Sequence, residues 1–219
     1  MSSTNRGSER EPSDAYFTPI DVARAIVQRL LDDNLVTRGC SVLEPSVGKG
    51  AFAVAADELL APNELDVVDL VIQPEIKLLD VNDFQQDFLT FDQQPQRYGL
   101  ILGNPPYADA ERHVRHALAL LEDNGRLAFL LRVNFLEGKE RQRGLWREHP
   151  PEYIYVLDRR PTFKTTTKPK LDKVTRQPML NKRTSEPLMV TTKNDSCAYG
   201  VFVWAKASAF EPVIRFLQW

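Results

Sequence analysis

Cysteine and histidine are scarce in this sequence, with two cysteines and three histidines in 219 residues. Cys40 and Cys197 stand far apart and show no spacing typical of metal ligands. His113 and His116 are three residues apart in a predicted helix, where we expect them on a solvated face. The sequence therefore predicts no metal site. Few cysteines are typical of a reducing compartment, so we expect a cytoplasmic protein.

Long apolar runs are also missing. No stretch of 18 apolar residues and no secretory signal peptide is visible, so we expect no membrane association. The formal net charge is -2, so no overall basic field indicates nucleic acid. What is present suits one globular domain with a substantial core, since 42% of the residues are hydrophobic. We expect a disordered polar tail over 1–14 and a single domain over 15–219.

The most informative stretch is Asn104-Pro105-Pro106-Tyr107, which follows an apolar segment at 98–103. The apolar run predicts a strand buried on both faces of a parallel sheet, and the prolines must end it. Open α/β sheets bind ligands at such strand ends. The Asn104 side-chain oxygen and the Pro105 carbonyl suit an exocyclic amine on a heteroaromatic ring, whose lone pair they would localise, while Tyr107 stacks on the ring. A plain Pro-Pro loop is the alternative.

A glycine loop stands between another predicted strand and helix. The strand at 41–43 runs into Glu-Pro-Ser-Val-Gly-Lys-Gly over 44–50, and apolar residues then predict a helix over 51–59. This order is typical of the first unit of a doubly wound sheet, in which Gly48 and Gly50 let the backbone approach a ligand. A Gly-x-Gly alone also fits a tight turn, and the spacing of a Walker loop is absent.

The remaining pattern completes an α/β arrangement. Thr18 is the predicted N-cap and Pro19 the N1 residue of an amphipathic helix, which does not explain Tyr16 and Phe17 ahead of the cap. Further strands are predicted at 66–72, before Asp87, and at 126–131, 153–157 and 199–204. A helix is predicted to start near 73–75, others cover 109–122 and 138–148, and a turn is predicted at 123–125. With 41–43 and 98–103, the strands number seven.

The composition changes between the last two predicted strands. From Arg159 to Asp195 the chain carries ten basic and three acidic residues, a net charge of +7. A loop of this length is usually functional or disordered. Two interpretations stay open: a solvated insertion, and an arm for nucleic-acid phosphates in which Arg159, Arg160 and Lys164 are candidate contacts.

Four motifs now stand in an order that resembles the S-adenosylmethionine-dependent adenine-N6 DNA methyltransferases whose cofactor motifs precede the catalytic one. They are Tyr-Phe-Thr-Pro (16–19), Leu-Glu-Pro-Ser-Val-Gly-Lys-Gly-Ala-Phe (43–52), Asp-Phe-Leu (87–89) and Asn-Pro-Pro-Tyr (104–107). The resemblance extends over about 16–135. It implies a Rossmann-like class I methyltransferase fold, with a seven-stranded, mostly parallel sheet and helices on both faces.

The resemblance also implies roles for individual residues. The methionine end of the cofactor would meet Tyr16, Thr18 and Pro19, and the sulfonium region would lie near Glu44, Pro45, Gly48 and Gly50. Asp87 and Phe88 would hold the cofactor's adenine. A flipped target base would meet Asn104, Pro105, Pro106 and Tyr107, with Phe163 as a second stacking face. Direct methyl transfer needs no metal, and proximity supplies much of the rate.

Two features depart from the family's pattern. No acid ends the predicted second strand at Ile72, so the ribose contact falls to Asp69, Gln73 or Glu75. The sequence also shows no separate target-recognition domain, so specificity could come from 159–195, from a homodimer or from a separate partner. Transfer to an RNA base amine, transfer to a protein glutamine amide, and an inactive nucleic-acid-binding fold stay open beside the DNA enzyme.

Overall fold

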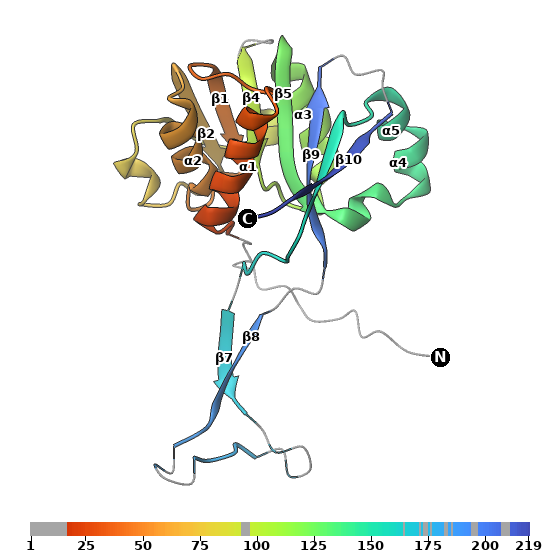
Figure 1. Cartoon of the computed structure of the whole chain (residues 1–219). Coiled ribbons are helices and arrows are strands. Elements are labelled where there is room, and N and C mark those ends of the chain that lie inside the picture. Colours follow the sequence, from red (N-terminus) through yellow and green to blue (C-terminus); the bar gives the residue numbers. More distant parts are fainter. Residues whose placement is uncertain are drawn as a thin grey trace.

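The structure is a computed structural model that describes residues 17–92, 97–163, 165–170, 172, 175, 177–181, 184, 186–193, 197–206 and 211–219. The predicted tail over 1–14, Tyr16 and Lys164 lie outside the described residues. A large sheet with helices on both faces forms the body, and a second sheet of two strands projects from it (Figure 1).

Within the described residues, eight strands form the large sheet in the order β10-β6-β9-β5-β4-β1-β2-β3. All neighbours are parallel except at β9, which runs antiparallel to both β5 and β6. The chain moves outward from β1 to β3 and returns to β4 beside β1, which places a switch point between β1 and β4. The strands are β1 (Ser41–Pro45), β2 (Glu64–Asp69), β3 (Asn82–Gln85), β4 (Tyr98–Gly103), β5 (Leu121–Arg132), β6 (Tyr153–Leu157), β9 (Tyr199–Ala205) and β10 (Val213–Leu217).

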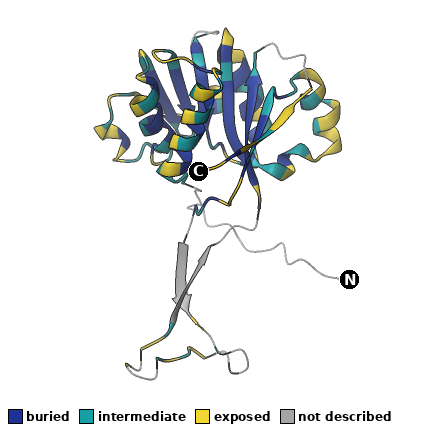
Figure 2. Ribbon diagram, in the orientation of Figure 1, coloured by how far each residue is buried: buried dark blue, intermediate teal, exposed yellow. Residues whose placement is uncertain are grey.

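Both faces of this sheet are covered, as the apolar strands predict. Alternate residues of β4 point to opposite faces. Leu100 and Leu102 pack in the core under α1 (Ile20–Asp32) and α2 (Ala51–Leu60). Ile101 packs under α3 (Ala110–Leu120) and η3 (Val133–Leu136). Figure 2 shows the central strands buried and the outer helix faces exposed. The mixed, mostly parallel sheet with helices on both faces (Figure 1) confirms the predicted fold class.

The sheet has one strand more than the seven that the sequence predicts. β10 pairs in parallel with β6 at the sheet edge. Ile214 and Phe216 are exposed, so the strand lacks the alternation that would reveal it in the sequence. A polar cluster attaches it to α1: the Asp33 carboxylate accepts hydrogen bonds from the Arg215 guanidinium and from the Tyr155 hydroxyl of β6.

Two further predictions are wrong for local reasons. β5 begins at Leu121 rather than at 126, because the predicted turn at 123–125 is a bulge in the strand: β4 advances two residues while β5 advances five. The predicted helix over 138–148 is broken at Gly144 into α4 (Lys139–Arg143) and α5 (Leu145–Glu148). Among the described residues, none of the helices combines the length and apolar composition needed to cross a bilayer.

The basic segment is not a simple loop. β7 (Thr165–Pro169) and β8 (Met189–Lys193) pair antiparallel, and Figure 1 shows this hairpin projecting from the body. The pairing continues beyond the strands, because the Lys170 amide donates to the Leu188 carbonyl and the Leu188 amide to the Met179 carbonyl. The segment between β6 and β9 therefore has backbone structure of its own.

Candidate active site

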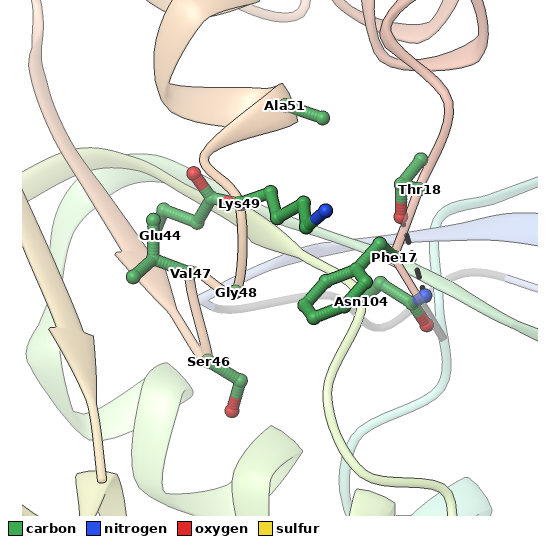
Figure 3. A pocket seen from close by; sticks show the side chains of 9 residues that line it. All are labelled: Phe17, Thr18, Glu44, Ser46, Val47, Gly48, Lys49, Ala51 and Asn104. Carbon is green, nitrogen blue, oxygen red and sulfur yellow. Dashed lines mark hydrogen bonds between the residues drawn. The ribbon is translucent and has the colours of Figure 1, made fainter. Parts of the chain in front are cut away.

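Three motifs far apart in the sequence meet at the carboxyl ends of β1 and β4. A small cavity there is lined by Phe17 and Thr18 before α1, by the loop from Glu44 to Ala51, and by Asn104 after β4 (Figure 3). It lies at the switch point of the sheet, where doubly wound folds bind ligands. Its volume is about 30 Å³, far below the roughly 300 Å³ at which ligand pockets begin.

Phe17 accounts for much of this closure. A Cβ atom added to Gly48 would lie 3.0 Å from the Phe17 ring, so the ring lies directly over the loop. The Lys49 ammonium lies 5.1 Å from the centroid of the same ring, in a cation–π contact. Phe17 and Lys49 must therefore move outward before a larger molecule can enter.

The glycine loop has the left-handed backbone that its composition predicts, with φ of 53° at Gly48 and 78° at Gly50. Asp69, the last residue of β2, holds the loop: its carboxylate accepts a hydrogen bond from the Gly48 amide at 2.8 Å. β2 ends three residues before the predicted end at Ile72. The expectation that no acid ends the second strand is therefore wrong.

Glu44 supplies the cap that α2 lacks. The helix begins after Gly50, which has no side chain to cap it, and the Glu44 carboxylate accepts a hydrogen bond from the Ala53 amide at 2.6 Å. The side chain is buried, and this burial raises the pKa of Glu44 well above its usual value; the nearby Asp69 charge adds to the shift, and the amide hydrogen bonds oppose it. Such a carboxyl holds a proton or favours a nearby cation.

Asn104 is oriented by Thr18, which the sequence predicts instead as the N-cap of the first helix. α1 begins at Ile20 with Pro19 as its N-cap residue, one position later than predicted, and Thr18 makes no capping bond. Instead the Asn104 side-chain nitrogen donates to the Thr18 hydroxyl at 3.2 Å (Figure 3). With its nitrogen toward Thr18, the amide directs its oxygen away from Thr18. Pro105, the next residue of the corner, is buried, whereas Pro106 is exposed.

An aromatic cluster continues from this corner. The Tyr107 ring lies 6.0 Å from Tyr199 of β9, and Tyr199 lies 4.9 Å from Phe163, measured between ring centroids. The structure thus brings Phe163, predicted as a second stacking face, into the cluster that contains Tyr107. Burial raises the pKa of the Tyr107 hydroxyl above its ordinary value, so this tyrosine stays neutral.

The motif after β3 divides into an exposed and a buried part. Asp87 is exposed, and its carboxylate accepts a hydrogen bond from the Leu89 amide at 2.9 Å. Phe88 is buried, with its ring centroid 5.4 Å from His113 and 4.8 Å from His116. A place for Phe88 beside a cofactor ring stays a prediction. The expectation of a solvated face is wrong for both histidines. His113 is buried, and the half-buried His116 donates a hydrogen bond from Nε2 to the Phe91 carbonyl at 3.0 Å.

The basic segment leaves and returns at the same edge of the sheet as the cavity. β6 is parallel to β4, and β9 is antiparallel to both β5 and β6, so the end of β6 and the start of β9 both lie at the carboxyl edge. Arg159 and Arg160 are exposed just after β6, and the Arg159 guanidinium lies 4.3 Å from the centroid of the Trp219 ring. Neither lines the cavity at the switch point.

No family model matches the sequence. The chain is 26% identical over 160 residues to M.CvrRI, a type II methyltransferase of Paramecium bursaria Chlorella virus XZ-6E; the match covers 61% of the chain and 40% of that protein. Among solved structures, a predicted O-methyltransferase from Agrobacterium tumefaciens superimposes with a TM-score of 0.55 at 12% identity, over 92% of the chain and 86% of that structure. The Burkholderia thailandensis 1,6-didemethyltoxoflavin-N1-methyltransferase, which contains S-adenosylhomocysteine, gives 0.52 at 16% identity, over 86% and 78%.

The fold is that of the class I methyltransferases. Within this fold the described residues contain no group of three or more His, Cys, Asp and Glu side chains that could hold a metal ion. The chain spans about 40% of the length of its curated relative. β10 and the β7–β8 hairpin are additions to the seven strands predicted for this class I methyltransferase sheet.

Proposed function

We propose that the chain transfers a methyl group from S-adenosylmethionine to the exocyclic N6 amine of adenine in DNA. The observation that carries this proposal is the position of Asn104, whose oriented amide lines the same cavity as the glycine loop. The likeness to a type II methyltransferase supports it, although that protein is much longer than this chain.

The residues around the cavity fit this cofactor. The left-handed backbone and the missing side chain at Gly48 let a ligand approach the main chain. The buried Glu44 carboxyl favours a cation, and a sulfonium is one. Asp69 at the end of β2 and the exposed Asp87 after β3 suit the ribose hydroxyls and the adenine amine. When bound, the cofactor supplies an electrophilic methyl group on its sulfonium.

The chain's own residues prepare the amine. We assign the Asn104 side-chain oxygen and the Pro105 carbonyl to accept the two N–H bonds of the target amine, which localises its lone pair on nitrogen. The adjoining prolines hold both acceptors in place before the reaction. The Tyr107 ring stacks on the base, which must leave the duplex because its amine is otherwise inaccessible. The nitrogen would bond to the methyl carbon as that carbon's bond to sulfur breaks, and the nitrogen would then release its extra proton to water, since the Asn104 amide oxygen is too weak a base to take it.

Asp69 bears on the alternative of an inactive fold. A missing acid at the end of the second strand would favour an inactive fold, and β2 does end on an acid, Asp69. The β7–β8 hairpin supports a polynucleotide substrate, because its segment is net +7 between Arg159 and Asp195 and starts at the carboxyl edge of the sheet. We assign this hairpin to phosphate contacts rather than to base readout.

The test is a methylation assay with radiolabelled S-adenosylmethionine and a mixture of DNA, RNA and glutamine-containing protein, followed by identification of the labelled nucleoside. We expect N6-methyladenine in DNA. Asn104→Ala should abolish the transfer and leave cofactor affinity by calorimetry nearly unchanged, whereas Asn63→Ala, at an exposed turn before β2, should transfer normally. Label only in RNA or protein, or no heat with the cofactor, would contradict the proposal.

A further inference from the structure

A second and larger cavity lies beyond Tyr107, at the carboxyl ends of β4 and β5. Its volume is about 260 Å³, and it shares no lining residue with the cavity at the switch point. Its walls include Tyr107, Arg132 at the end of β5, Asn134 of η3, and Arg141 of α4. Two guanidinium groups on one cavity indicate an anionic ligand.

Arg132 contacts two tyrosine side chains. Its guanidinium carbon lies 4.8 Å from the centroid of the Tyr107 ring, and its Nε donates to the Tyr199 hydroxyl at 3.3 Å. These two contacts help to fix the direction of the guanidinium. They also cover one face of the Tyr107 ring, so a base that stacks on Tyr107 must use the other face.

Arg141 is positioned in a similar way from the far wall. Its Nε donates to the Phe135 carbonyl at 2.9 Å, its Nη2 donates to the Glu137 carbonyl at 2.8 Å, and its guanidinium lies 4.5 Å from the centroid of the Phe135 ring. Within the part of the chain that the structure describes, no carboxylate forms an ion pair with Arg141. Its charge is therefore available to a ligand in the cavity.

We infer that this second cavity binds a backbone phosphate of the substrate strand, next to the nucleotide whose base enters the Asn104 corner. Tyr107 stands between the two sites: the base stacks on one face of its ring, and Arg132 lies over the other. A nucleotide in the corner brings its own phosphates close to Tyr107, and planar guanidinium groups match phosphate oxygens in pairs. The inference rests on the proposed function only in taking a polynucleotide as substrate, and it holds equally for DNA and RNA.

The test measures binding of fluorescent duplex and single-stranded oligonucleotides, of DNA and of RNA, at a series of salt concentrations. Each lost phosphate contact lowers the slope of log affinity against log salt by about 0.7 to 0.9. Arg132→Met and Arg141→Met should each show this decrease. Between 50 and 200 mM salt, the fold-loss of oligonucleotide affinity should then be about three times smaller in each variant than in the unmodified protein. Arg132→Lys keeps the charge and should keep the slope.

Arg24→Met is the matched control, because Arg24 lies on α1 in an exposed ion pair with Glu58 and should leave the slope unchanged. Thermal unfolding of Arg132→Met separates lost packing on Tyr107 from lost charge, since packing alone leaves the slope intact. Unchanged slopes in both methionine variants would overturn the inference. It would also be overturned if Arg132 were needed to bind inorganic phosphate but had no effect on the slope measured with polynucleotides. Normal methylation with unchanged slopes defeats this inference alone; reduced slopes without methylation defeat only the proposed function.

Discussion

Gly50 offers a sharp test of how the glycine loop is packed. It has a φ of 78°, and a Cβ atom placed on it would lie 2.6 Å from Cδ1 of Ile76, a fully buried residue of η1 (Ile76–Leu78). Alanine at this position therefore meets two separate penalties, a strained backbone and a steric overlap. Gly39 isolates the first, because its φ is 75° and a Cβ there has no neighbour within 4 Å.

The expected magnitudes follow from these two geometries. A left-handed conformation costs an L-residue about 1–2 kcal/mol, so Gly39→Ala should lower the free energy of unfolding by that amount. Overpacking a core site adds about 1–3 kcal/mol, so Gly50→Ala should lower it by about 2–5 kcal/mol. Replacing Ile76 by valine removes the Cδ1 atom, at a cost of its own of about 0.5–1.5 kcal/mol.

The assay is urea unfolding, followed by circular dichroism, of the two alanine variants, Ile76→Val, and the double variant. The double variant should be more stable than the sum of the single losses predicts, because valine makes room for the new methyl group. If Gly50→Ala costs no more than Gly39→Ala, or if the losses at Gly50 and Ile76 simply add, then packing against η1 is not what requires a glycine here.

Three other predictions concern charge. Burial acts to raise the pKa of Asp33, but hydrogen bonds from Tyr155 and two arginines outweigh it and hold that pKa below its usual value. The stabilisation from Asp33 is therefore present above about pH 4 and is lost as the pH falls through the folded-state pKa. Asp33→Asn should flatten the fall of the urea-unfolding free energy at acid pH, and an unaltered fall would contradict this. The pKa of Glu44 is raised, mainly by burial. Its contribution to the free energy of unfolding is therefore present below about pH 4.3 and is lost as the pH rises through the folded-state pKa. Glu44→Gln should remove this decline in stability with rising pH, and a decline that persists in the variant would belong to another group. Deleting 165–192 should weaken DNA binding in filter assays at low salt and spare cofactor affinity by calorimetry; equal DNA affinity across a salt series would make the segment a solvated insertion.

The interior strands could be predicted because each is buried on both faces. The apolar run at 153–157 matches β6 residue for residue, and the run at 98–103 matches β4. β10 could not be found this way, because an edge strand with exposed apolar side chains lacks both an unbroken buried run and an alternating pattern. The bulge in β5 also depends on tertiary pairing, since its residues 123–125 have ordinary turn chemistry.

The meeting of the glycine loop and Asn104 followed from the family resemblance, and the structure brings it about because the neighbouring parallel strands β1 and β4 end at one edge. The position of Asp69 at the end of β2 could not be predicted, because the apolar residues 70–72 continue the pattern of β2 beyond its true end. The burial of His113 had a readable signal: it shares the 3–4 residue spacing of the buried stripe of α3. The bond from Asn104 to Thr18 left no sequence signal, since a threonine before a proline already fits a helix start.

The hydrogen bond from Asn104 to Thr18 joins groups 86 residues apart, so it connects the segment before α1 to the corner after β4. A contact between residues so far apart in the chain requires much of the chain entropy to be lost before it can form. Displacing this segment, by a bound partner or a bulky fusion, would break the bond and would also move Phe17 away from Gly48 and Lys49. Asn104 would then lose one of the contacts that set the direction of its amide.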